Sequence, residues 1–227
     1  MGRTAAPPSV RSAGDVLDVL LGFLDAVAGS GELLVVGHSA GAHYARAIGA
    51  RRPDRVAGLA LVCPLLMETH DVPEHRPIVA DEQLGDEEFR DYFTVQTPTM
   101  LDRYERFVAP ALPLVDEVAL ERIGERWELD VSGAYSGPTL VVAGRQDSIV
   151  GYAASVDLLR RYPRATLAVL DGAGHALPHE QPDVLAALLS EWLDRTASVP
   201  SVPHRRRAVQ PSLSSAASTS GCSCGNA

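Results

Sequence analysis

The sequence contains no lysine: all 20 of its basic side chains are arginine, and we have no physical account of this bias. Basic residues are also in the minority, since 29 acidic residues leave a formal net charge of −9. A chain that binds nucleic acid or an anionic membrane usually carries a basic face, because its partner presents a dense array of negative charge. The composition therefore argues against both as partners, and it leaves the substrate open.

Long hydrophobic runs and cysteine pairs are also lacking. The longest apolar stretch near the start, residues 16–27, is interrupted by two aspartates, so it is neither the core of a secretory signal nor a membrane span. We therefore expect a cytoplasmic protein. Of the three cysteines, Cys63 ends a predicted buried strand, while Cys222 and Cys224 lie near the C-terminus, so no disulfide framework is indicated.

The residues that are present fit one globular unit followed by a tail. The chain has 227 residues, of which 46% are hydrophobic and 22% are charged, close to ordinary globular usage. We expect a single domain over residues 1–197. Beyond it serine, proline, alanine and arginine dominate, and such a segment has too little apolar surface to offset its ordering entropy. Residues 198–227 are therefore predicted to be a disordered tail.

The most informative segment is a serine between two glycines, Gly37-His38-Ser39-Ala40-Gly41. It follows the apolar run 33–36 and precedes a helix-prone stretch, which predicts a strand, a sharp turn and a helix with Ser39 at the apex. Such a turn holds the serine at strained backbone angles, and a Cβ on Gly37 or Gly41 is expected to collide with neighbouring backbone. The alternative is a plain glycine-bounded turn. The flanking strand and helix favour a nucleophilic serine.

Two later strands end in an acid and a histidine. The apolar run 139–143 is followed by Asp147, and the run 166–170 is followed by His175. Parallel strands end at one edge of a sheet, where open α/β sheets hold the residues that handle ligands. With Ser39, these residues therefore form a candidate catalytic triad in the chain order serine, acid, histidine.

Asp147 and His175 have alternative interpretations. Asp147 could simply cap the helix that follows it. Asp171 is a competing acid, but it lies too close in sequence to His175. His175 could instead be an ordinary histidine in a surface loop. Its place after the serine and the acid, which is the chain order of the triad, argues against that alternative.

These segments resemble the α/β-hydrolase family over roughly residues 2–195, most of all its serine esterase, lipase and peroxidase-like members. The shared patterns are a G-H-S-x-G elbow at 37–41, a G-x-x-D turn at 144–147 and a G-H-x-x-P-H-E-x-P segment at 174–182. The resemblance implies an α/β fold with a mostly parallel sheet and flanking helices. It also implies four roles: Ser39 as nucleophile, His175 as general base and then acid, Asp147 as the group that orients the imidazole, and the Ala40 amide as an oxyanion-hole donor.

The expected elements agree with such a fold. Ser12 with Asp15 predicts the start of a helix that covers one face of the sheet, and Pro182 opens the last helix. The run 56–62 is continuously apolar, as in parallel strands buried on both faces. Residues from about 65 to 137 are helical, polar and aromatic-bearing, which predicts a cap inserted between strands. The predicted apolar stripes are Val16, Leu20, Phe23, Leu24 and Val27 on the first helix and Val184, Leu185, Leu188, Leu189 and Trp192 on the last.

The chain differs from this family ahead of the elbow. Relatives place the elbow after the fifth strand of an eight-stranded sheet, whereas only 38 residues precede Ser39 here. We therefore expect an α/β-hydrolase-like core that lacks its first strands and leaves strand 33–36 at an open edge, which favours self-association. The segment that carries a second oxyanion donor is missing with those strands, so we expect impaired activity.

Metal ligation is a weaker interpretation of the histidines and cysteines. His175 and His179 are four residues apart, but Pro178 between them disfavours the helix that would place both on one face. Cys222 and Cys224 fall short of the four ligands that a structural zinc site takes. We expect neither a metal ion nor a cofactor, and we expect a structural role for His179.

Three functions fit these features. The favoured one is hydrolysis of a small carboxylic ester or related acyl compound through an acyl-enzyme, because a serine at the elbow argues against the haloalkane and epoxide branches of the fold, which use aspartate there. The second is a catalytically weak or inert α/β-hydrolase-like protein. The third is acyl transfer or perhydrolysis by the same triad. Whether water or another acceptor takes the acyl group would depend on how far the cap excludes water. A small acyl molecule is the expected partner.

Overall fold

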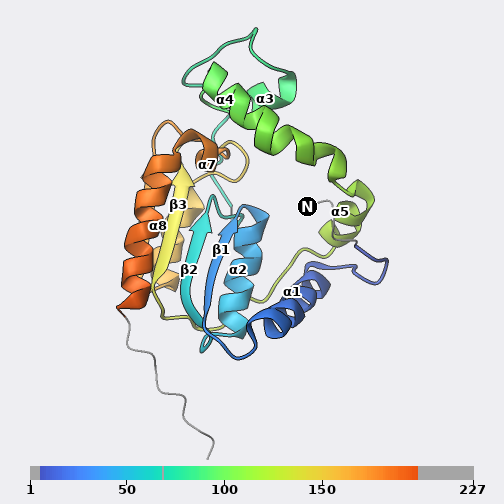
Figure 1. Ribbon diagram of the computed structural model, residues 1–227, viewed down its shortest axis with the longest axis vertical. Helices are drawn as coiled ribbons and strands as arrows, with labels where there is room; N and C mark the ends of the chain where they lie inside the picture. The colour runs from blue at the N-terminus through green and yellow to red at the C-terminus, as the bar shows by residue number, and fades with distance from the viewer. Residues whose placement is uncertain (1–5, 68, 199–227) are drawn as a thin grey trace, which may run out of the picture.

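The computed structural model describes residues 6–67 and 69–198 (Figure 1). Apart from Ser198, the predicted tail lies outside these residues, as do Cys222 and Cys224. The described chain contains one four-stranded parallel sheet in the order β1 (Leu33–His38), β2 (Val56–Val62), β3 (Thr139–Gly144) and β4 (Ala165–Leu170). The predicted α/β class, with a parallel sheet and flanking helices, is confirmed.

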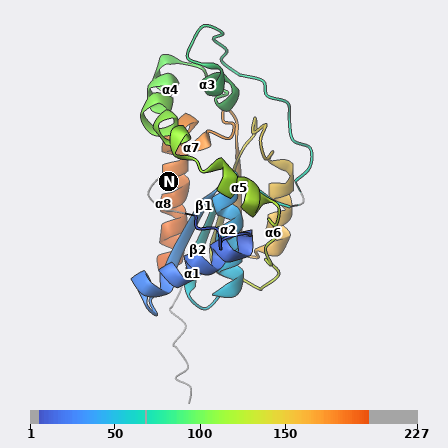
Figure 2. The ribbon, with the colours of Figure 1, turned by 90° about the vertical axis from the view of Figure 1, so that its right-hand side faces the viewer.

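Helices cover both faces of this sheet (Figures 1 and 2). Successive residues of β2 point to opposite faces, so Leu59 packs in the cluster of buried residues that includes α2 (Ala40–Arg51) and α6 (Leu158–Arg161). Ala60 packs in the cluster that includes α8 (Pro182–Ala197). Burial on both faces explains why the run 56–62 is apolar at every position. The side chain of Trp192 anchors α8, since it is buried and its indole donates to the carbonyl of Pro138 at 3.2 Å.

The first helix, α1 (Ala13–Ala28), begins where it was predicted to begin. Ser12 accepts a hydrogen bond from the Asp15 amide at 3.1 Å and so caps the helix. The predicted apolar stripe is wrong at Phe23 and Val27, which are exposed, whereas its Leu24 does pack against the core. The buried positions of the helix are Ala13, Leu17 and Leu21, which the predicted stripe did not include. The physical reason is that α1 packs mainly against α2, so its rotation is set by that helix rather than by the sheet.

Strand β1 lies at the edge of the sheet, as expected. It pairs with β2, and no described strand lies on its other side. On the face shared with α8, Leu34 is 50% exposed and Val36 is 55% exposed. The β1 edge is therefore apolar and open over the described residues.

A long insertion separates β2 from β3. Its first part lies beyond the carboxyl ends of the strands, and we refer to residues 69–114 as the cap (Figure 1). The next part of the insertion, up to Arg126, packs beside α1, where the Ala13 amide donates to the carbonyl of Arg126 at 2.9 Å. The part that follows contacts α2, where the Trp127 ring stacks on that of His43. The elements of the insertion are α3 (Glu87–Tyr92), α4 (Pro98–Arg103), the π-helical turn η1 (Tyr104–Val108), the 3-10 turn η2 (Ala109–Leu114) and α5 (Glu117–Gly124).

Two short elements complete the fold, η3 (Ala153–Asp157) after β3 and α7 (Leu177–Glu180) ahead of α8. Within the described ranges, none of the helices combines the length and the apolar character needed to cross a bilayer.

Candidate active site

The turn between β1 and α2 holds Ser39 in a strained backbone conformation. Its φ is 54° and its ψ is −123°, angles that a residue with a Cβ rarely adopts. Surrounding backbone holds this conformation in place. The Ser39 amide donates to the carbonyl of Val62 at 3.0 Å, and the Ser39 carbonyl accepts from the amides of Ala42 at 2.9 Å and Leu65 at 3.2 Å.

The two glycines of the elbow differ in what they allow. A Cβ built on Gly37 would lie 2.3 Å from the carbonyl oxygen of Gly41, so only glycine fits there. The same expectation is wrong for Gly41, because beyond its chain neighbours and the backbone of its own helix none of the described atoms lies within 4 Å of a Cβ built on it. Gly41 is exposed on the first turn of α2, which leaves open space beside it.

The structure brings Ser39, Asp147 and His175 together at the carboxyl ends of β1, β3 and β4. His175 Nε2 lies 2.9 Å from Ser39 Oγ, and His175 Nδ1 lies 2.9 Å from Asp147 Oδ2. The imidazole and the carboxylate are both buried. An ionised carboxylate can only accept a hydrogen bond, so Nδ1 carries the proton and Nε2 is left to accept from the Ser39 hydroxyl.

Asp147 is the acid that meets His175. Its other carboxylate oxygen accepts from the amides of Val150 at 2.9 Å and Ile149 at 3.0 Å. Burial by itself raises the pKa of Asp147, but the hydrogen bond and charge of His175 and these two amides outweigh it, so the pKa lies below its ordinary value. Asp171, the competing acid, is exposed and accepts from Gln146 Nε2 at 2.7 Å.

Ala40 occupies the first position of α2, directly after Ser39. The first amides of a helix have no partner within the helix, and they carry the positive end of the helix dipole. The Ala40 amide therefore belongs to a helix end that is suited to stabilising negative charge next to Ser39.

His38, the remaining residue of the elbow, contacts the loop that carries His175. Its Nε2 lies 3.0 Å from the carbonyl oxygen of His175, and since a carbonyl can only accept, Nε2 carries the proton. Burial lowers the pKa of His38, and the nearby imidazole of His175 lowers it further. A neutral His38 therefore ties the elbow to the loop of His175.

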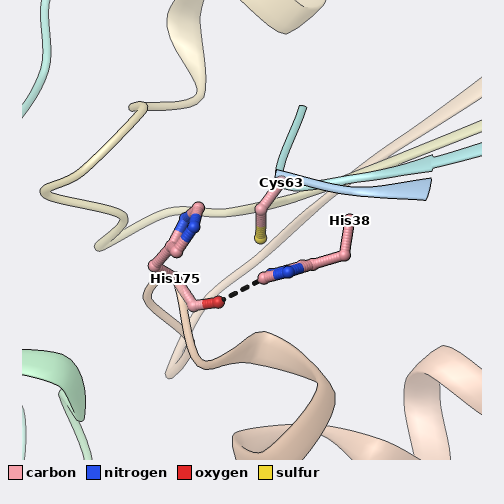
Figure 3. A group of neighbouring side chains, drawn as sticks. All are labelled: His38, Cys63 and His175. Atoms are coloured by element: carbon pink, nitrogen blue, oxygen red, sulfur yellow. Dashed lines mark hydrogen bonds between the residues drawn. The ribbon is translucent and has the colours of Figure 1, made fainter. Parts of the chain in front are cut away.

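His38, Cys63 and His175 form a cluster whose metal-ligating atoms lie within 4.8 Å of one another (Figure 3). Both ring nitrogens of His175 are already engaged by Asp147 and Ser39. Burial raises the pKa of the Cys63 thiol, and the charge of Asp147 raises it further, which opposes the thiolate that a metal ion needs. The cluster is thus better suited to the hydrogen-bonded triad than to a metal ion.

The cap places Tyr92 beside His175. The Tyr92 and His175 rings meet edge to face, with centroids 6.2 Å apart. Burial raises the pKa of Tyr92 to about 12, and the neighbouring Cys63 adds to the shift, so the hydroxyl keeps its proton at neutral pH. Nothing in the sequence around Tyr92 marked it beyond its place among the aromatic residues of the cap.

His179 lies apart from the triad. Its ring stacks on Phe107 with centroids 6.2 Å apart, and its backbone carbonyl accepts from the guanidinium of Arg103. Burial lowers the pKa of His179, and the charge of Arg103 lowers it further. These contacts join α7 to the cap, which agrees with a structural role.

A family model described as "Alpha/beta hydrolase family" matches residues 1–188 of the chain. In sequence, the chain is 25% identical to the 2-(acetamidomethylene)succinate hydrolase of Mesorhizobium japonicum (strain LMG 29417 / CECT 9101 / MAFF 303099) over 215 residues, which cover 85% of this chain and 75% of that protein.

Two further likenesses cover different shares of the chain. RutD of Pantoea ananatis (strain LMG 20103), a provisionally assigned carbamate hydrolase, is 32% identical over 88 residues, which span 37% of this chain and only 32% of RutD. The crystal structure of an alpha/beta superfamily hydrolase from Oenococcus oeni PSU-1 superposes with a TM-score of 0.77 at 21% identity, covering 85% of this chain and 77% of that one.

Proposed function

The chain belongs to the alpha/beta hydrolase family, and on that premise we propose that it is a serine hydrolase that cleaves a small carboxylic ester or a related acyl substrate. The observation that supports this proposal is the hydrogen-bonded chain from Ser39 Oγ through His175 to Asp147, with 2.9 Å at each step. A serine hydroxyl becomes a good nucleophile only when an adjacent base takes its proton, and Nε2 of His175 is in position to do so.

In the proposed mechanism, Ser39 Oγ attacks the carbonyl carbon of the substrate while its proton passes to His175 Nε2. Asp147 keeps the imidazole in the required tautomer and stabilises the imidazolium that forms. The negative charge that develops on the carbonyl oxygen faces the amide of Ala40 at the start of α2.

The acyl-enzyme forms when the carbon–oxygen bond to the leaving group breaks and His175 returns its proton to that group. A water molecule then repeats the sequence: His175 takes its proton, the hydroxide attacks the acyl carbon, and the proton returns to Ser39 Oγ as the acid leaves. Atoms and protons balance over the cycle, since water supplies the hydroxyl of the acid and the hydrogen of the alcohol.

The proposed mechanism requires a substrate with a transferable acyl group, and this requirement defines the substrate class only broadly. The names of the two sequence relatives describe hydrolases of a carbamate and of an acetamidomethylene succinate, so carbamates and amides join esters among the related acyl substrates. Transfer of the acyl group to an acceptor other than water uses the same triad and is the alternative reaction. A weak or inert protein is the other alternative, favoured by the open β1 edge.

Hydrolysis of p-nitrophenyl acetate tests the proposal. We expect a burst of p-nitrophenolate equal to the enzyme concentration, followed by slower turnover, because acylation of Ser39 precedes deacylation. Ser39→Ala should abolish both phases. A matched control is Ser148→Ala, since Ser148 Oγ also lies near a histidine ring, 3.4 Å from His75 Nδ1, and this variant should keep the burst. Hydrolysis that is unchanged in Ser39→Ala would contradict the proposal.

A further inference from the structure

Glu180, the last residue of α7, is buried against the active site but has no part in the reaction proposed above. Its side chain is only 9% exposed, and its two carboxylate oxygens accept four hydrogen bonds. Oε1 accepts from the Thr94 amide at 2.6 Å, the Thr94 hydroxyl at 2.8 Å and the Val95 amide at 3.1 Å. Oε2 accepts from the Gly174 amide at 2.6 Å.

The two oxygens of Glu180 bind different parts of the molecule. Oε1 binds the cap just after Tyr92, whose ring contacts the imidazole of His175. Oε2 binds the residue that immediately precedes His175 in the loop after β4. One side chain therefore connects the cap to the loop that carries the candidate base.

Packing around the Glu180 carboxylate shows independently that the cap and the His175 loop meet there. A Cβ built on Gly174 would lie 2.8 Å from Cγ2 of Thr94, so the cap and the His175 loop are in close contact there. On the other side of His175, Ala176 is fully buried in the cluster that contains Phe89 and Phe93 of the cap. The His175 loop is thus held between α7 and the cap on both sides of the imidazole.

The cap segment at this junction, residues 94–96, is itself anchored to residues 78–79 of the cap. The carbonyl of Thr94 accepts from the Ile78 amide at 2.8 Å, and the Gln96 amide donates to the carbonyl of Val79 at 2.8 Å. The donors that face Glu180 therefore belong to a hydrogen-bonded segment with a defined position.

We infer that Glu180 is a positioning residue that locks cap residues 92–95 to the His175 loop, so that Tyr92 and His175 are held as one unit beside Ser39. The inference rests on the proposed function for its effect on rate. It matters because small displacements of a catalytic group lower turnover strongly, and a misplacement of about 1 Å can cost about 100-fold.

A carboxylate suits this position better than an amide. All four partners are donors, so they need a group that only accepts. A glutamine at 180 would keep the shape of the side chain but would turn its NH2 group toward one set of donors. Facing Gly174 with the NH2 loses one bond, whereas facing Thr94 and Val95 with it loses the bonds of both backbone amides, since only the Thr94 hydroxyl can turn to accept. Glu180→Gln should therefore keep the contact with the cap and lose the contact with Gly174.

The test compares Glu180→Gln with wild type and with Glu82→Gln, the same change at an exposed glutamate of the cap. For p-nitrophenyl acetate, we expect Glu180→Gln to lower kcat about 10–100-fold with little change in KM, while Glu82→Gln stays within about twofold. Hydrogen exchange should quicken at the Gly174 amide of Glu180→Gln and stay slow at the Thr94 and Val95 amides. A merely structural role predicts a lower melting temperature with an unchanged kcat for the folded protein, and that result would overturn the inference.

The exchange measurement separates this inference from the proposed function. If the wild type hydrolyses no ester, the proposed function fails. The contact between the cap and the His175 loop would still be supported if the Gly174 amide is protected in the wild type and loses that protection in Glu180→Gln. Unchanged protection would refute the contact.

Should Glu180→Gln not fold, Thr94→Ala removes one donor and the Cγ2 contact with Gly174. It should quicken exchange at Gly174, and exchange equal to that of the wild type would count against the inference.

Discussion

The two glycines of the elbow contribute unequally to the fold, although the sequence pattern treats them alike. We expect Gly37→Ala to lower the free energy of unfolding by roughly 1–3 kcal/mol, because its Cβ would have to displace the Gly41 carbonyl 2.3 Å away. Gly41→Ala should leave that free energy unchanged or raise it by up to about 1 kcal/mol, because alanine is the better helix former and has free space. Urea unfolding of both variants is the measurement, and equal losses would contradict the assignment.

The carboxylate of Asp147 should affect both rate and stability. In Asp147→Asn the single side-chain oxygen stays with the amides of Ile149 and Val150, so the NH2 group faces the imidazole in place of its acceptor. We therefore expect kcat to fall by about 10³–10⁴-fold. The pKa of Asp147 lies below its ordinary value because the hydrogen bonds from His175 and the two amides outweigh burial. A carboxyl group whose pKa is lowered by folding contributes stability above its unfolded pKa, and it loses that contribution as the pH falls through the folded pKa.

Asp147→Asn should therefore be destabilised most near neutral pH. The difference in unfolding free energy between wild type and variant should shrink below about pH 4, where the carboxylate of the unfolded wild type begins to take up protons. Denaturant unfolding from pH 3 to pH 7 measures this difference. A difference that grows in acid would mean that burial, rather than the hydrogen bonds, controls Asp147.

Individual residues also show what sequence reasoning can and cannot reach. The positions of Ser39, Asp147 and His175 could be predicted because each follows a strand, and parallel strands bring their carboxyl ends to one edge. The contact between Glu180 and Thr94 joins residues 86 positions apart and has no local pattern of its own. The place of Tyr92 beside His175 depends likewise on how the cap folds back, which no spacing in the sequence reveals.

At the scale of the elements, the presence of a helix was easier to predict than the face that the helix buries. The capping residue Ser12 and the periodicity of α1 predicted its start and its helical state. They did not predict the buried stripe, because several faces of α1 carry apolar residues and packing against α2 selected the one with Leu17 and Leu21. Strands β2 and β3 were simpler to predict, because both of their faces are buried and no choice between a buried and an exposed face arises.

The open β1 edge leads to a prediction about self-association. We propose that the described chain associates with a second copy through this edge, because its exposed apolar residues and unpaired backbone groups favour strand pairing. Static light scattering should show species larger than a monomer, and Leu34→Arg should reduce them. Val118→Arg on α5, a change at another exposed apolar residue, should have no effect. A monodisperse wild-type monomer would rule out this association.

For the whole molecule, the sequence predicted the layers of the fold better than the path of the insertion. Apolar strands alternating with helices are sufficient to indicate a parallel sheet covered on two faces. The insertion between β2 and β3 was predicted as one cap, yet its second half packs beside α1 and α2 rather than over the strand ends (Figure 2). Polar helices with a few aromatic residues carry too little periodicity to show which surface they cover.

The central claim is that Ser39 is a nucleophile activated by His175, and covalent labelling tests it most directly. The protein is treated with a fluorophosphonate probe, its intact mass is measured, and the modified residue is located by peptide mapping. We predict one adduct per chain, on Ser39, that is absent in Ser39→Ala and strongly reduced in His175→Ala. Ser148, which lies near His75, should stay unmodified. No adduct on the folded protein, or an adduct that persists in Ser39→Ala, would contradict the account.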